Sequence, residues 1–214
     1  MTTHMKRLIL AGIGIIILLA LASLNPTGWQ FFGVSLILIA YAVAPYVNFQ
    51  SKWLRFWLIL FSGLFIEFLA WLNNYLSQVK NPPLFHPVLW ADLLIGLFFY
   101  SSLALAWNIT EKYWGMKLRD LIIISAVYSI CIEQLGKILL SFNIAAYIFV
   151  ALVYLSVVLP AFLVVKPKDK AVPIWKRYVY GLLVLTIFSI VGTHILAAPF
   201  YKIIPAKPLT AQIK

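Results

Sequence analysis

Seven long apolar runs, separated by short polar or proline-containing breaks, restrict the fold of this chain more than any other feature. A helix needs about 20 apolar residues to cross a bilayer, and it satisfies its own backbone hydrogen bonds in lipid. We therefore predict an all-α integral membrane protein, a bundle of about seven transmembrane helices in a single domain over residues 1–214. The predicted spans are 8–24, 30–49, 53–76, 85–107, 118–142, 145–165 and 178–201.

The composition agrees with this class and excludes others. Hydrophobic residues make up 64% of the chain and charged residues 11%, whereas soluble domains average roughly 45–50% and 25%. The net charge is +11, from 17 basic and 6 acidic residues. In a membrane protein such an excess is typical of the positive-inside rule, so we expect no nucleic-acid partner.

The basic residues also predict an orientation. Twelve of the 17 fall in breaks on one side of the predicted membrane and four on the other. Because positive residues favour the cytoplasmic side, we predict a cytoplasmic N-terminus and an extracytoplasmic C-terminus, in a bacterial or archaeal plasma membrane. The twelve are Lys6, Arg7, Lys52, Arg55, Lys112, Lys117, Arg119, Lys166, Lys168, Lys170, Lys176 and Arg177.

The first run has a second interpretation. The segment Met5-Lys6-Arg7 precedes it and Ala20-Leu21-Ala22 resembles a cleavage site, as in a signal peptide. We expect the run to remain as the first membrane helix.

The six acidic residues divide into two groups. Three, Glu111, Asp120 and Asp169, are expected in solvated cytoplasmic loops. The other three, Glu67, Asp92 and Glu133, fall inside predicted spans. A charge in the hydrocarbon region costs several kcal/mol and usually faces the bundle interior or a watery cavity. We therefore predict these three as the catalytic residues.

The intramembrane acids lie at similar depths. At 1.5 Å per residue, Glu67, Asp92 and Glu133 are about 10 to 13 Å below the outer ends of their predicted helices. This indicates a polar pocket in the extracytoplasmic half. Other polar or aromatic side chains of that half are predicted to bind substrate: Trp71, Asn73, Asn74, His86, Gln134, Lys137 and His194.

Residue spacing adds detail to the predicted pocket. Gly63 and Glu67 share a face of the third span, and Asp92 and Gly96 share a face of the fourth. Glycines beside the acids would let the two helices approach closely.

Structural interpretations remain open for most of these residues. Glu133 and Lys137 are spaced i, i+4 and could form a structural ion pair. One of Glu67 and Asp92 could pair with Lys137 while the other stays neutral. His86 could be an interfacial residue, and His194 could form a hydrogen bond between helices.

Several chemistries do not fit the residues available, and we expect no metal and no cofactor. The single cysteine, Cys131, excludes an internal disulfide, a Cys-based zinc site and an iron–sulfur site. Three histidines are too few for the histidine clusters of membrane di-iron oxidases. The chain also lacks a paired-aspartate motif for magnesium diphosphate.

Two classes of function remain. The first is an enzyme that uses carboxyl groups for acid–base chemistry on a lipophilic substrate, an isoprenoid or another lipid. In size and layout, with Glu67 in Phe65-Ile66-Glu67-Phe68 and Asp92 in Trp90-Ala91-Asp92-Leu93, the chain is similar to small membrane-bound terpene cyclases and carotenoid-modifying proteins. The second class is a solute or proton-coupled carrier, or a membrane subunit of a larger complex. The expected partners are membrane lipids, the lipophilic substrate, and a second copy or complex partner.

Overall fold

The computed structural model describes residues 2–24, 28, 32–47, 49–78, 84–133 and 137–203, and this part of the chain is helical. An isolated bridge between Phe49 and Val165 is its only extended pairing. The helices are α1 Thr3–Leu24, α2 Val34–Val43, α3 Lys52–Leu76, α4 Leu89–Trp114, α5 Leu118–Val127, α6 Lys137–Leu140, α7 Ile144–Val164, α8 Ile174–Ile190 and α9 Ala198–Ile203. A 3₁₀ turn, Ala44–Tyr46, extends α2, and π-helical segments follow α5 (Tyr128–Glu133) and α8 (Val191–Leu196).

Five of the helices are long and apolar enough to cross a membrane, which agrees with the predicted all-α membrane class. They are Thr3–Leu21, Lys52–Leu76, Leu89–Trp114, Ile144–Val164 and the continuous stretch Ile174–Phe200. The predicted second span corresponds to the shorter apolar helix Val34–Tyr46. The predicted fifth span corresponds to α5, its π-helical continuation and α6, with 134–136 outside the described residues.

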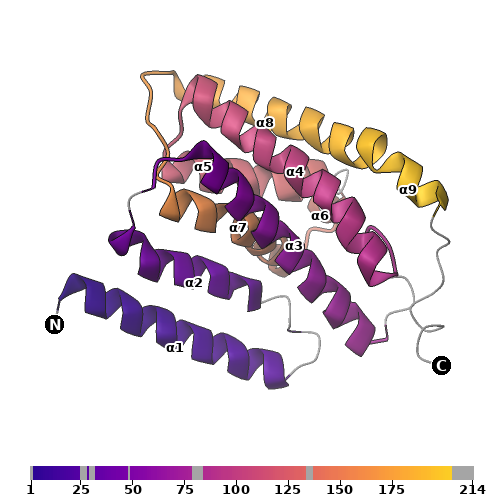
Figure 1. Cartoon of the computed structure of the whole chain (residues 1–214), viewed down its shortest axis with the longest axis horizontal. Helices are drawn as coiled ribbons and strands as arrows, with labels where there is room; N and C mark the ends of the chain where they lie inside the picture. Colours follow the sequence, from indigo (N-terminus) through magenta and orange to yellow (C-terminus); the bar gives the residue numbers. More distant parts are fainter. Residues whose placement is uncertain are drawn as a thin grey trace.

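The helices lie side by side along the long axis of the molecule (Figure 1). α3 packs against α4 and α7, α4 also contacts α8, and α2 lies between α1 and α7. The starts of α3 and α8, the end of α4 and the segment 165–173 meet at one end, which we call the basic end (Figure 1). The end of α3 and the start of α4 lie at the opposite end, which we call the acid end (Figure 1).

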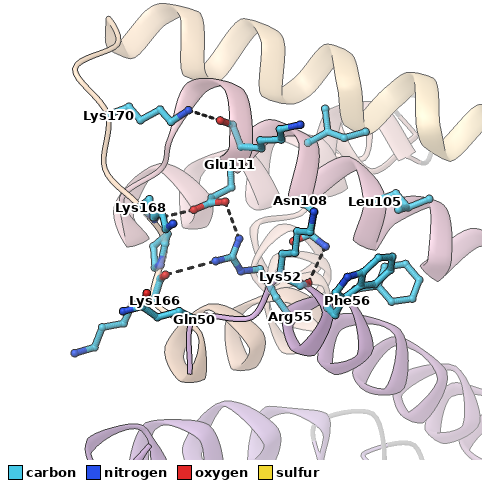
Figure 2. A pocket seen from close by; sticks show the side chains of 14 residues that line it. Gln50, Lys52, Arg55, Phe56, Leu105, Asn108, Glu111, Lys166, Lys168 and Lys170 are labelled. Atoms are coloured by element: carbon cyan, nitrogen blue, oxygen red, sulfur yellow. Dashed lines mark hydrogen bonds and ion pairs between the residues drawn. The ribbon is translucent and has the colours of Figure 1, made fainter. Parts of the chain in front are cut away.

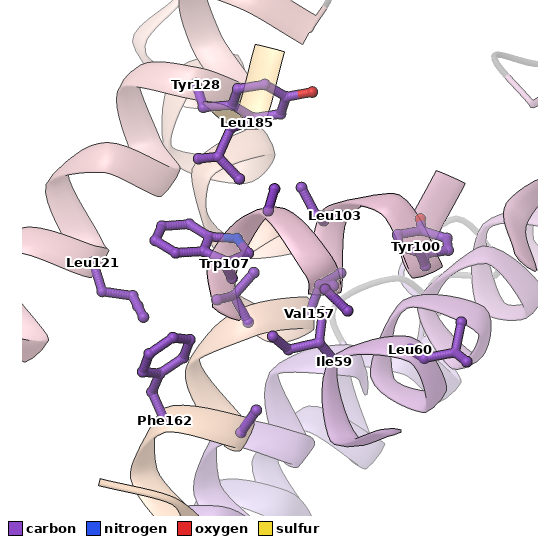
Figure 3. Packing of buried hydrophobic residues seen from close by; sticks show 14 of the residues in the cluster. Ile59, Leu60, Tyr100, Leu103, Trp107, Leu121, Tyr128, Val157, Phe162 and Leu185 are labelled. Atoms are coloured by element: carbon purple, nitrogen blue, oxygen red, sulfur yellow. The ribbon is translucent and has the colours of Figure 1, made fainter. Parts of the chain in front are cut away.

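The core lies where α3, α4, α5, α7 and α8 converge (Figure 3). Trp107 of α4 is 1% exposed and makes an edge-on contact with Phe162 of α7, with 5.8 Å between ring centroids. Leu121 and Leu185 are fully buried beside them (Figure 3). This apolar layer separates the polar groups of the two ends.

The ends of α4 differ from the sequence-based prediction, which placed this span at 85–107. Pro87 disfavours a helical conformation at His86, and α4 begins only at Leu89. α4 then continues to Trp114, and within this extension Thr110 Oγ1 donates to the carbonyl of Ala106. The polar residues after 107 were interpreted as a loop and are helical.

Local sequence explains where the long helices begin and end at the basic end. The Ser51 side chain accepts a hydrogen bond from the Leu54 amide and caps the start of α3. Gly115 ends α4 with a φ of 64°, in the region that favours glycine. A Cβ at Gly115 would lie 2.7 Å from the Lys170 amide nitrogen, so glycine also permits this close approach of two segments.

Candidate intramembrane acid site

α3 and α4 approach closely at Gly63, one of the two glycines that the spacing predicted. A Cβ at Gly63 of α3 would lie 2.2 Å from Cδ1 of Tyr100, so the tyrosine ring occupies that space. A Cβ at Gly96 of α4 would lie 3.7 Å from Cγ of Glu67. The distance at Gly96 is an ordinary van der Waals contact, so Gly63 is the glycine that the close approach of the two acid-bearing faces requires.

Glu67 is buried between the two helices. Its side chain accepts a hydrogen bond from the Tyr100 hydroxyl, with 2.8 Å between Tyr100 Oη and Glu67 Oε2. Glu67 is 8% exposed and Tyr100 6%. Tyr100 was not predicted as a site residue, although Asp92, Gly96 and Tyr100 follow one another at four-residue spacing on α4.

Asp92 lies in the first turn of α4 and is fully buried. Its Oδ1 accepts a hydrogen bond from the His86 amide at 2.8 Å. The start of a helix favours a negative side chain. Because α4 begins at Leu89, Asp92 is only about 5 Å along the helix, and the predicted depth of about 10 Å below the helix end was wrong.

The carboxyl groups of Glu67 and Asp92 interact across the α3–α4 contact and are close enough to share a hydrogen bond. A carboxylate has no proton to donate, so such a bond requires a proton on one of the two groups. No N–H or hydroxyl of the described residues donates to Asp92 Oδ2, which is consistent with a proton in this position. The pair has the elements of a proton donor and a proton acceptor side by side.

His86 adds a buried polar group to the pair. Its Nδ1 accepts a hydrogen bond from the Val88 amide at 3.1 Å, so the neutral ring carries its proton on Nε2. Among the described residues no acceptor reaches this Nε2, and His86 is only 3% exposed. We refer to Glu67, Asp92, Tyr100 and His86 as the acid cluster.

Trp71 holds the segment that covers the acid cluster. Its Nε1 donates to the carbonyl of Pro87 at 2.9 Å and so fastens residues 84–88 to α3. Asn73 and Asn74 are buried nearby on α3, and Asn74 Nδ2 donates to the Ala70 carbonyl within the helix. Four predicted substrate-binding residues thus lie on α3 or in the covering segment.

The remaining predicted site residues lie elsewhere or are not described. The side chains of Lys137 and His194 are exposed, so neither belongs to the buried acid cluster. Gln134 and the side chain of Glu133 lie outside the described residues, so the predicted pairing of Glu133 with Lys137 stays a prediction. Within the described residues, no three His, Cys, Asp or Glu side chains gather into a metal-binding group.

Glu111 was predicted to lie in a solvated loop, and this prediction was wrong. Glu111 is 8% exposed and its Oε2 lies 3.0 Å from Nη1 of Arg55, which is 3% exposed. The Lys168 amide donates to Glu111 Oε1 at 2.8 Å. This ion pair joins α3, α4 and the 165–173 segment at the basic end.

Asp120 was also predicted as solvated and is fully buried. Arg177 Nη1 donates to its Oδ2 at 2.9 Å, and Arg177 Nη2 donates to Asp169 Oδ1 at 2.8 Å. Desolvation acts to raise the pKa of Asp169, but hydrogen bonds and charges from Lys117 and Arg177 outweigh it and lower that pKa. A sequence signal was the Lys117–Asp120 spacing, at which the Asp120 carboxylate accepts a hydrogen bond from the Lys117 amide at the start of α5.

Comparison of the chain with protein-family models, curated proteins and solved structures gave no match.

Proposed function

We propose that the protein is a membrane enzyme in which the acid cluster performs acid–base chemistry on a lipophilic substrate, an isoprenoid or another lipid. The observation that carries the proposal is the interaction of Glu67 and Asp92, two buried carboxyl groups from neighbouring helices. A neutral carboxylic acid in an apolar surrounding is a competent proton donor, and a neighbouring carboxylate can accept a proton.

The proposed reaction conserves all atoms. The shared proton of the pair adds to one carbon of a substrate double bond, whose π electrons form the new C–H bond and leave a cation on the other carbon. The pair is then a dianion and stabilises that cation. A carboxylate removes a proton from a carbon next to the cation, a new double bond forms, and the pair regains its proton. The product is an isomer of the substrate.

Tyr100 and His86 have supporting roles in this proposal. The Tyr100 hydroxyl, which donates to Glu67 Oε2, keeps that carboxyl group oriented toward Asp92 and stabilises it when ionised. The buried Nε2–H of His86 would donate to an oxygen atom of the substrate. Trp71, Asn73 and Asn74 would shape the site, and we keep Glu133, Gln134, Lys137 and His194 as candidates near its entrance.

The proposal includes the membrane arrangement. We propose that α2 and the α5–α6 region complete about seven crossings, with the basic end in the cytoplasm and the acid end in the outer half of the plasma membrane. The excess of lysine and arginine at the basic end supports this orientation.

Infrared spectroscopy of the purified protein at neutral pH tests the shared proton. The wild type should show a protonated-carboxyl C=O band that disappears in Asp92→Asn and in Glu67→Gln, because either substitution replaces one of the two carboxyl groups. Asp169→Asn is the matched control, since Asp169 is half-exposed and paired with Lys117 and Arg177. A wild-type spectrum without the band would contradict the shared proton.

Mass spectrometry of lipid extracts tests the reaction. Cells that express the wild type or Asp169→Asn should contain an isomerised apolar lipid that is missing from cells with Asp92→Asn or Glu67→Gln. All four proteins must be present in the membrane in equal amounts. If the two acid-cluster variants give the same extract as the wild type, the enzymatic proposal is wrong.

Proton-coupled transport is a second candidate. It is favoured by one observation: α3 and α4 carry buried polar groups at both ends, Glu67 with Asp92 and Arg55 with Glu111. The apolar layer around Trp107 would then act as the gate. Proton uptake into proteoliposomes that is lost in Asp92→Asn, together with unchanged lipid extracts, would favour transport.

A further inference from the structure

A cavity of about 780 Å³ lies at the basic end (Figure 2), where α3 begins and α4 ends, whereas the acid cluster lies near the other ends of these two helices. The start of α3, the last turns of α4 and the segment after α7 line it. Small-molecule sites commonly have volumes of roughly 300–1,000 Å³. The cavity is therefore large enough for a lipid headgroup with part of a chain.

The charge around the cavity is strongly positive. Its lining contains the lysines Lys52, Lys112, Lys166, Lys168 and Lys170. Among the described lining residues the only acid is Glu111, and Arg55 pairs with it. An anion is the complementary ligand.

The lysine-bearing segment is held in place through its backbone. Arg55 Nη2 donates to the carbonyl of Lys166 at 3.5 Å, and the Lys168 amide donates to Glu111 (Figure 2). The side chains of Lys166 and Lys168 are exposed, so their charged ends are available to a ligand. Substituting these two side chains would leave the backbone hydrogen bonds unchanged.

One wall of the cavity is apolar. It contains Trp53, Phe56 and Leu105, of which Trp53 is 61% and Leu105 42% exposed. These residues belong to helices with the length and composition of membrane spans, so their exposed faces suit lipid chains. The cavity thus combines a cationic rim with an apolar wall, as an amphiphilic anion requires.

Asn108 supplies a specific polar group in the lining. Its Nδ2 donates to the carbonyl of Lys52 at 3.2 Å, which fixes the orientation of the amide. Its Oδ1 is buried and receives no hydrogen bond from the described residues. A hydroxyl group on the ligand would be a suitable donor.

We propose that this cavity binds the headgroup of one anionic membrane phospholipid, a site separate from the proposed catalytic one. The phosphate lies among the lysines, with Lys166 and Lys168 as its main contacts. A headgroup hydroxyl donates to Asn108 Oδ1. The start of an acyl chain lies against Trp53 and Leu105.

Native mass spectrometry of the purified full chain in non-ionic detergent tests the proposal. The probes are dioctanoyl phosphatidylglycerol, dioctanoyl phosphatidylcholine and inorganic phosphate. We expect one molecule of phosphatidylglycerol to bind at least about tenfold more tightly than phosphatidylcholine, because only the former carries a net negative charge. Millimolar inorganic phosphate should not displace it, since the free ion lacks the apolar part.

A charge-matched pair of variants locates the site. Lys166→Gln/Lys168→Gln should weaken phosphatidylglycerol binding by about fivefold for each lysine. Lys6→Gln/Lys176→Gln removes the same charge at the same end, outside the cavity lining, and should change binding less than about twofold. Trp53→Gln should weaken phosphatidylglycerol binding without exposing the core, because Trp53 is already exposed.

Three results would overturn the proposal. Equal loss of phosphatidylglycerol binding in the two double variants would indicate a general effect of surface charge. Equal binding of the two lipids would remove the anion requirement. Displacement by inorganic phosphate would indicate a site for soluble anions and not for a lipid.

Discussion

The two ends of the α3–α4 pair bury carboxyl groups in opposite ways. At the basic end, Glu111 is paired with the guanidinium of Arg55 and receives a backbone hydrogen bond from a third segment. At the acid end, the carboxyl group of Glu67 accepts a hydrogen bond from the Tyr100 hydroxyl and interacts with a second carboxyl group, that of Asp92. The same two helices therefore hold a charge-balanced ion pair and a pair of acids, separated by 12 residues on α3 (Arg55 to Glu67) and by 19 residues on α4 (Asp92 to Glu111).

The difference separates a structural arrangement from a reactive one. A buried ion pair holds segments together, and its loss leaves an uncompensated charge. Two neighbouring acids gain nothing from mutual attraction and are linked only through a proton. We expect substitutions at the basic end to affect folding and substitutions at the acid end to affect function.

Arg55→Met should give the largest loss of stability. It leaves Glu111 buried without its guanidinium, and breaking a buried ion pair in this way costs about 3–5 kcal/mol. Thermal unfolding in detergent measures the loss. The double variant Arg55→Met/Glu111→Leu should recover much of it, because both charges are gone. A single variant as stable as the wild type would show that the ion pair does not hold the basic end together.

Gly63→Ala should have an intermediate effect. The new methyl group would meet the Tyr100 ring at 2.2 Å, and overpacking of this kind costs about 1–3 kcal/mol. The ring must move, so the hydrogen bond to Glu67 should also weaken. Gly12→Ala is a suitable control, because nothing lies within 4 Å of a Cβ there. Equal unfolding temperatures for the two variants would argue against close packing at Gly63.

Asp92→Asn should change stability by less than about 1 kcal/mol, far less than Arg55→Met. The Asn oxygen can still accept from the His86 amide, and its amide group can donate to Glu67 in place of the shared proton. The measurement is the unfolding temperature, with lipid products as the second readout. A loss as large as that of Arg55→Met would mean that Asp92 is mainly structural.

The smallest effect on stability is expected from the titration of Asp169. Asp169 has a lowered pKa in the folded protein, so its contribution is present above the unfolded value of about 3.9 and disappears as pH falls through the lower folded value. Unfolding temperatures of the wild type and Asp169→Asn should therefore differ near pH 7 and converge below about pH 4. A difference in unfolding temperature that stays constant with pH would contradict this stabilising role of Asp169. High salt should reduce the difference as well.

The acid end was largely predictable from sequence. Acidic residues are rare in apolar runs, which identified Glu67 and Asp92, and four-residue spacing identified the neighbouring glycines. Tyr100 was missed because a tyrosine in an apolar run is usually ordinary packing. The start of α4 was misplaced because the span was drawn from apolar composition alone. Pro87 disfavours a helical conformation at His86, so the helix begins only at Leu89.

The basic end was not predictable in the same way. Its lysines and arginines fitted the positive-inside rule, which explained their number without indicating partners. Arg177 and Asp120 are 57 residues apart, and no local spacing indicates that folding brings them together. The burial of Glu111 depends likewise on Arg55 from another helix.

The segment over the acid cluster is fastened by one of the acids that it covers. The His86 amide donates to Asp92 Oδ1, and Trp71 provides the second attachment at Pro87. An amide bonds more strongly to a carboxylate than to a neutral acid, so the strength of this closure follows the ionisation of Asp92. The charge state of Asp92 thus sets the strength of one of the two hydrogen bonds that hold this segment, and the Trp71 bond holds it independently of that charge.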